Sequence, residues 1–144
     1  GEREVRARVG SAGGRLELAN GGRLEIPAGA LAQETEIFFG TGASAREAWD
    51  AETKQPLGPT LEVRPAIVAA NGAEFRVSAP ATQVPDGFEA DDLALGHEEE
   101  VDARHLSATT ATRWQMWPAR VESGRFVADL PALGGHRVQF GVSR

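Results

Sequence analysis

The segment 97–105, with the sequence HEEEVDARH, gathers several potential metal ligands in this 144-residue chain. Two histidines four residues apart on a helix, with a glutamate as general base, form the zinc-peptidase motif. Here Val101 stands four residues after His97, so that motif is absent. The remaining chemistry open to this segment is the binding of a cation by carboxylate oxygens.

Calcium is a cation that proteins bind through carboxylate oxygens. The chain has no Asp-x-Asp-x-Asp-Gly loop, which is the spacing of a dedicated calcium site. Runs of charge are usually solvated, so the sequence favours an exposed acidic strand end over a metal site. The weak calcium candidates are Asp91, Asp92, Glu98, Glu100 and Asp102.

The sequence offers no recognisable catalytic motif. Gly-x-Ser-x-Gly is absent, and the chain has no cysteine, which excludes thiol nucleophiles, thiolate metal sites and disulfides. A glycosidase-type pair of carboxylates stays open, because the separation of the two groups is a property of the fold. We therefore expect no catalytic residue, no cofactor and a protein that is not an enzyme.

Three tryptophans are the other side chains of interest, because aromatic faces can stack on sugar rings. For Trp114 and Trp117 the sequence favours structural roles, in the core and at a sheet edge, since buried indoles contribute strongly to stability. Trp49 lies in an insertion between strands, where binding residues concentrate, but it could equally anchor that insertion. The candidates for partner binding are Trp49 and Trp117.

Composition narrows the class of protein. The hydrophobic fraction of 41% indicates a globular chain, and 144 residues correspond to a single domain over 1–144. A net charge of −6 disfavours binding to nucleic acid. No apolar run is long enough for a membrane span, so we expect no membrane insertion by this segment. Because Gly1 is an unusual natural start, we expect a domain excised from a larger protein.

The elements that would position these side chains are short strands. Two alternating runs, 15–18 and 23–26, flank Asn20-Gly21-Gly22 and predict a β-hairpin. The proline and glycine of 27–31 predict a tight corner after it. Similar runs recur along the chain with turn signals every 8–12 residues or so, the spacing of a sandwich or barrel. We predict an all-β, antiparallel β-sandwich of about nine to eleven short strands.

One short helix is expected in an insertion at 44–53. Ser44 and Glu47 fit a capping box, with Ser44 as the N-cap residue. The alternation of the strands also predicts the core of the sandwich. Its expected members are Val9, Leu16, Leu18, Leu24, Ile26, Leu31, Ile37, Phe39, Leu61, Val63, Phe75, Val77, Leu95, Trp114, Phe126, Leu130, Val138 and Phe140.

Several of these motifs together resemble the ZU-five domain, the β-sandwich module of zonula occludens proteins, Unc-five netrin receptors and ankyrins. The most specific match is the Ile-Pro-x-Gly-Ala-Leu sequence of 26–31, and the resemblance extends over about 9–142. The other matching positions are Gly13, Gly14, Thr35, Glu36, Ile37, Asn71, Gly72, Phe75, Pro80, Arg113, Trp114, Gly124, Phe126 and His136.

The resemblance implies a sandwich that serves as an interaction or structural module, found in bacteria in secreted proteins and lipoproteins. Some relatives pair this sandwich with a second domain that cleaves itself at a His-Phe-Ser or similar sequence. The nearest match here is His136-Arg137-Val138, which lacks a hydroxyl nucleophile, so we predict no self-cleavage.

The sequence thus favours a noncatalytic protein-interaction or structural module of a bacterial envelope or secreted protein, in an extracytoplasmic location. Exposed sheet edges and the loop 40–59 would contact a protein partner, and one way to do so is the addition of a strand from that partner. One alternative is a carbohydrate- or surface-binding adhesin module, which exposed indoles of Trp49 or Trp117 would favour. The second is a hydrolase, which a deep pocket holding His97 or His105 against a carboxylate would favour.

Overall fold

The computed structural model describes residues 4–102 and 110–144, which form two main antiparallel sheets. The larger has seven strands, six of them in one row. In spatial order the row is β1 (Glu4–Val9), β4 (Thr35–Thr41), β6 (Leu61–Arg64), β14 (Arg137–Ser143), β9 (Leu93–Asp102) and β10 (Thr110–Pro118), and β5 (Lys54–Pro56) pairs with the end of β14.

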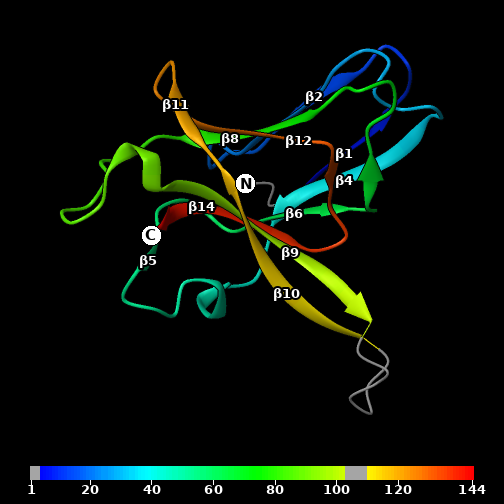
Figure 1. Cartoon of the computed structure of the whole chain (residues 1–144). Helices are drawn as coiled ribbons and strands as arrows, with labels where there is room; N and C mark the ends of the chain where they lie inside the picture. Colours follow the sequence, from blue (N-terminus) through cyan, green and yellow to red (C-terminus); the bar gives the residue numbers. More distant parts are fainter. Residues whose placement is uncertain (1–3, 103–109) are drawn as a thin grey trace.

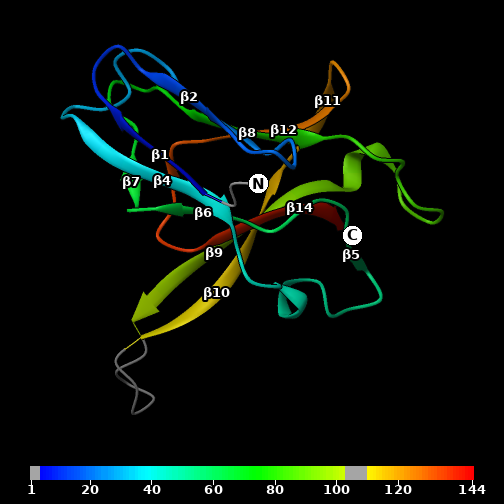
Figure 2. The ribbon, with the colours of Figure 1, turned by 180° about the vertical axis from the view of Figure 1, so that it is seen from behind.

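The second main sheet has five strands and packs face to face on the first. Its order is β11 (Arg120–Glu122), β12 (Arg125–Leu130), β8 (Phe75–Pro80), β3 (Arg23–Ile26) and β2 (Gly14–Glu17). A small sheet joins β13 (Ala132–Leu133) to β7 (Ile67–Val68). Figure 1 shows the five-stranded sheet above the seven-stranded one, and Figure 2 shows the same two layers from behind. The predicted all-β antiparallel sandwich is confirmed.

The described residues contain fourteen strands, more than the nine to eleven expected. The additional ones are pieces of two or three residues, such as β5, β7 and β13. Pieces of two or three residues are too short to show alternation in a sequence. They form where a neighbouring strand offers main-chain hydrogen-bond partners. The longer strands lie where the alternating runs predicted them.

Turn chemistry explains how consecutive strands meet. The predicted hairpin is β2–β3, and the Asn20 side-chain oxygen accepts a hydrogen bond of 2.8 Å from the Gly22 amide in its turn. Asn71 and Gly72 have φ of 59° and 73°, the left-handed conformation that Asn and Gly adopt most readily in tight turns. In the predicted corner, Gly29 has a φ of 82°, which favours glycine.

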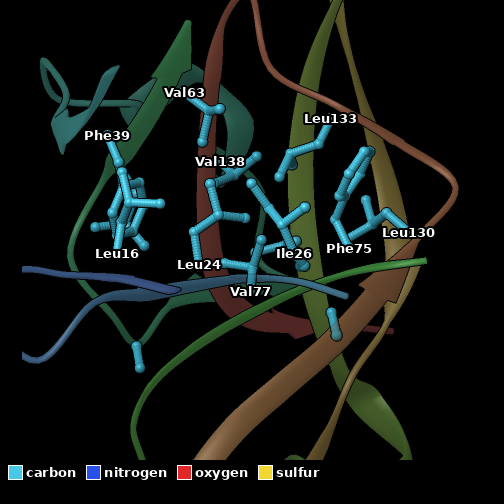
Figure 3. Close-up of a cluster of buried hydrophobic side chains, with 14 of the residues drawn as sticks. Leu16, Leu24, Ile26, Phe39, Val63, Phe75, Val77, Leu130, Leu133 and Val138 are labelled. Carbon is cyan, nitrogen blue, oxygen red and sulfur yellow. The ribbon is translucent and has the colours of Figure 1, made fainter. Parts of the chain in front are cut away.

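The core lies between the two main sheets. Figure 3 shows Leu24 and Val77 from one sheet near Val138 from the other, with Phe75 and Leu130 close by. Every residue of the predicted core is buried except Trp114, which is half-buried and packs in a second cluster. The alternation of side chains along a strand explains this difference. Trp114 pairs with Glu98, which lies on the outer face of the larger sheet, whereas Leu95, three residues before Glu98, faces the core.

The segment between β4 and β6 covers part of that outer face. It contains a single turn of 3₁₀ helix, η1 (Arg46–Ala48), instead of the predicted helix over 44–53. The predicted capping box is wrong, since the N-cap residue is Ala45 and no side chain caps the turn. One turn has too few hydrogen bonds to stand alone, so tertiary contacts hold this segment in place.

Candidate functional site

The free edge of β10 is the feature of this fold best suited to binding. Each main sheet ends in two edge strands, whose outward main-chain groups have no strand partner among the described residues. β10 has nine residues, whereas β1 has six, β2 four and β11 three. In Figure 1, β9 and β10 run side by side as a long hairpin that extends away from the two layers. β10 therefore offers the longest unpaired edge in the described part of the chain.

Few of the devices that normally guard an edge strand are present on β10. β1 carries Glu4, Arg6 and Arg8 on its outer face, and charges of this kind discourage strand addition. The described side chains of β10, from 112 to 118, include one charge, Arg113, whose Nε donates to Glu99 at 2.6 Å. The edge is thus nearly neutral until Pro118 ends it.

The two faces of β10 present different side chains to an added strand. Trp114 and Met116 lie on the outer face, half-buried against the 3₁₀ segment. Gln115 and Trp117 lie on the core-facing side, where Trp117 pairs with Leu95 and packs at the rim of the core. Val121 of β11, three residues after Pro118, is 51% exposed. The strand and its continuation therefore expose apolar surface beside free main-chain groups.

Trp49 is an anchor and not an exposed contact residue. Its side chain is buried, with 5% of the residue exposed, and its Nε1 donates to the Gln139 side-chain oxygen at 2.9 Å. The ring lies over Gly96 and Gly141, two glycines inside strands. A Cβ on Gly141 would stand 2.6 Å from this ring, and one on Gly96 would stand 3.1 Å from it. The burial of Trp49 counts against a sugar-binding platform at this residue.

Arg137 of β14 forms a second set of contacts between the sheet and the 3₁₀ segment. Its guanidinium donates to both carboxylate oxygens of Glu98, at 2.9 and 2.7 Å, and it also bonds Glu47. A further hydrogen bond of 2.6 Å reaches the Ser44 carbonyl. The guanidinium also lies 5.4 Å from the centre of the Trp114 ring, within the range of a cation–π contact. Hydrogen bonds from Arg137 lower the pKa of Glu98.

His97 lies on the other face of the sheet from Glu98 and Trp114, the face that also carries Leu95. It is 9% exposed, and neither ring nitrogen has a hydrogen-bond partner. Burial lowers the pKa of His97, against the opposing influence of Glu99 and Glu98, while the nearby His136 lowers it further. The surroundings of the buried His97 ring on β9 therefore disfavour its charged form.

The acidic candidates do not come together into one cation site. Asp91 and Asp92 lie in the 3₁₀ turn η2 (Ala90–Asp92), where the Asp92 carboxylate accepts from the Glu89 amide at 2.8 Å. Glu98 stands six residues along an extended strand, which is about 20 Å away at roughly 3.3 Å per residue. Glu98 bonds Arg137, and Glu100 lies 3.3 Å from the His136 ring. The side chain of Asp102 lies outside the described residues.

Within residues 4–102 and 110–144, no group of three or more His, Cys, Asp or Glu side chains is arranged to hold a metal ion. The grooves on the described surface include one of about 510 Å³, lined by residues such as Arg76 and Asp129, and one of about 530 Å³, lined by residues such as Arg46 and Trp49. Neither groove is lined by a histidine or a serine. His105, the other histidine of the hydrolase hypothesis, lies outside the described residues.

Sequence reasoning missed the main parts of this region. It assigned no role to Arg137, Gln139 or the glycines at 96 and 141. The glycines carried a usable signal, since a glycine inside a strand often marks a place where another group approaches the backbone closely. Trp117, a predicted candidate, does lie on β10, whereas Trp49 lies on the segment between β4 and β6 and is only 5% exposed.

Comparisons with known proteins do not assign the chain to a family. No protein-family model matches the chain, and no curated protein matches it. In the described part of the chain, no helix has both the length and the apolar character needed to cross a membrane.

Proposed function

We propose that this chain is a noncatalytic protein-interaction module that binds an extended segment of its partner as an added strand along β10. The observation that carries the proposal is the nine-residue edge of β10, which pairs with β9 on one side and with no described strand on the other. Strand addition draws its affinity from main-chain hydrogen bonds and its specificity from alternate side chains. The module belongs, in this proposal, to a larger bacterial envelope or secreted protein.

Two further features support the proposal. The apolar and aromatic side chains of Trp117 and Met116 flank the free main-chain groups, and an incoming strand can bury them further. The ZU-five-like sequence of 26–31 forms a corner that leaves the β10 edge untouched, and the domain it resembles is an interaction or structural module.

The proposal is tested by selecting peptides from a random displayed library against the immobilised 144-residue chain. We expect to select peptides with alternating apolar residues. Gln115→Lys should weaken their binding at least tenfold, because Gln115 is exposed in the middle of β10 and a lysine there would place a charge beside the added strand. Gln33→Lys, at an exposed loop position, is the matched control and should leave binding unchanged.

A second probe distinguishes strand addition from other binding modes. The best selected peptide is made again with N-methyl groups on alternate residues, which removes main-chain donors from one edge while keeping the side chains. We expect one of the two methylation patterns to abolish binding. Peptides that bind Gln115→Lys as tightly as the unaltered chain, and that tolerate both methylation patterns, would overturn the proposal.

A further inference from the structure

We infer that the strand best suited to the β10 edge is β10 of a second copy of this chain, paired antiparallel about a two-fold axis at Gln115. This inference rests on the proposed function, since it uses the same edge and names its occupant. A two-fold interface must be self-complementary, because each residue of one copy meets its symmetry partner in the other. The sequence from 112 to 118 meets that requirement.

The side chains that would oppose one another across the axis suit each other in pairs. Arg113 comes opposite Trp117 of the second copy, and an arginine over an indole makes a cation–π contact. Trp114 comes opposite Met116, and a thioether beside an aromatic ring is also favourable. Gln115 faces its own equivalent, and two amide side chains can donate to and accept from each other.

The faces of the strand agree with this pairing. Residues directly opposite in an antiparallel pair lie on the same face of the sheet. Arg113 and Trp117 both lie on the core-facing side of β10, as shown by their pairing with Glu99 and Leu95. Trp114 and Met116 both lie on the outer face, against the 3₁₀ segment. Each proposed pair thus joins side chains that already point the same way.

Charge excludes the register in which the two-fold axis passes through Arg113. Arg113 is the single charged residue among positions 112–118, so a two-fold axis at Arg113 would bring two guanidinium groups together. An axis at Gln115 keeps them apart and leaves each Arg113 beside its own Glu99. Pro118 lacks a main-chain donor and comes opposite Thr112, which limits the paired length to these seven positions. An interface of this size is small, so we expect association to depend on concentration.

Sedimentation equilibrium over a range of concentrations tests the inference on the full 144-residue chain, whose mass is 15.3 kDa. We expect the average mass to rise toward twice this value as concentration increases. Gln115→Lys places two ammonium groups at the axis and should keep the chain monomeric, whereas Gln33→Lys should behave as the unaltered chain does.

A cross-linking experiment locates the contact independently of stability. Because the chain has no cysteine, Gln115→Cys introduces a single thiol, and two such thiols would face each other at the axis. A short thiol-specific cross-linker should give a covalent dimer with Gln115→Cys and none with Gln33→Cys.

The outcomes separate this inference from the proposed function. A dimer that persists in Gln115→Lys and does not cross-link through Gln115→Cys forms elsewhere and overturns the inference. A monomer at all concentrations also overturns it, and peptides that bind the β10 edge would then leave the proposed function standing. If the chain is monomeric and selects no edge-binding peptide, both fail.

Discussion

At the scale of single residues, Arg137 does the most to hold the outer face of the larger sheet together. It binds Glu98 with two hydrogen bonds, reaches Glu47 and Ser44 on the 3₁₀ segment, and stacks on Trp114. The Glu98 side chain is only 7% exposed. Removing one partner of such a pair is costly because it leaves an uncompensated charge away from water.

We therefore predict that Arg137→Met lowers the free energy of unfolding by about 3–5 kcal/mol, measured by urea denaturation at pH 7. The control is Arg8→Met, which removes an exposed ion pair with Glu34 and should cost less than about 1 kcal/mol. Adding Glu98→Leu to Arg137→Met should recover part of the loss. Equal costs for Arg137→Met and Arg8→Met would contradict this role for Arg137.

His97 predicts a dependence of stability on pH. Burial lowers its pKa in the folded chain below the ordinary value of 6.5, which we take for the unfolded chain. At pH values between the folded and the unfolded pKa of His97, the unfolded chain binds more protons than the folded chain, so the free energy of unfolding rises with pH. The stability is fully present above about 6.5 and is lost as pH falls through the folded pKa.

The measurement is urea denaturation at pH 7.5, 6.5 and 5.5, above the range in which Glu98 titrates, because the pKa of that carboxyl is lowered from 4.5. We expect the unaltered chain to lose stability over this series, whereas His97→Leu should lose much less. Parallel losses in the two proteins would show that another group is responsible.

At the scale of elements, the 3₁₀ segment and the sheet beneath it fit through two glycines. Trp49 lies over Gly96 of β9 and Gly141 of β14, and both strands have room for the ring because they carry no Cβ there. The indole then reaches Gln139. An element with one helical turn is thus positioned by the shape of its neighbour and not by its own propensity.

Gly141→Ala should therefore destabilise the chain by about 1–3 kcal/mol, the usual cost of overpacking, because the new Cβ would clash with the main-chain oxygen of Gln55 on β5 and stand 2.6 Å from the Trp49 ring. Gly14→Ala is the matched control, since its Cβ would lie 3.5 Å from Val9, at ordinary contact distance. Thermal unfolding followed by circular dichroism compares the two. A cost for Gly141→Ala no larger than that of Gly14→Ala would contradict the packing described here.

At the scale of the whole molecule, two sheets close over one core while the β9–β10 hairpin extends beyond it. The Phe126 and Phe140 rings, one from each sheet, meet with centroids 5.9 Å apart inside that core. The hairpin leaves the edge of β10 open, and this asymmetry is what makes β10 the candidate interface. The net charge of −6 disfavours nonspecific association of copies of the chain, whereas the β10 edge itself is nearly neutral.

The sequence by itself determined the class of fold and most of the core. Alternation with a period of two shows which residues of a strand face inward, and turn residues such as Asn71 and Gly72 act locally through their own backbone preferences. These signals depend only on neighbours in the chain. For that reason the hairpin, the corner at 27–31 and every predicted core residue except Trp114 were correctly placed.

Only the tertiary structure decided which edge stays free and what the outer face holds. Glu98 and Arg137 are 39 residues apart in the chain, and Trp49 and Gln139 are 90 apart. Such contacts depend on which strands become neighbours, and no local pattern carries that order. The same strand order leaves β10 without a second neighbour in the part of the chain that the structure describes. An edge is defined by the absence of a strand beside it and not by any residue within it.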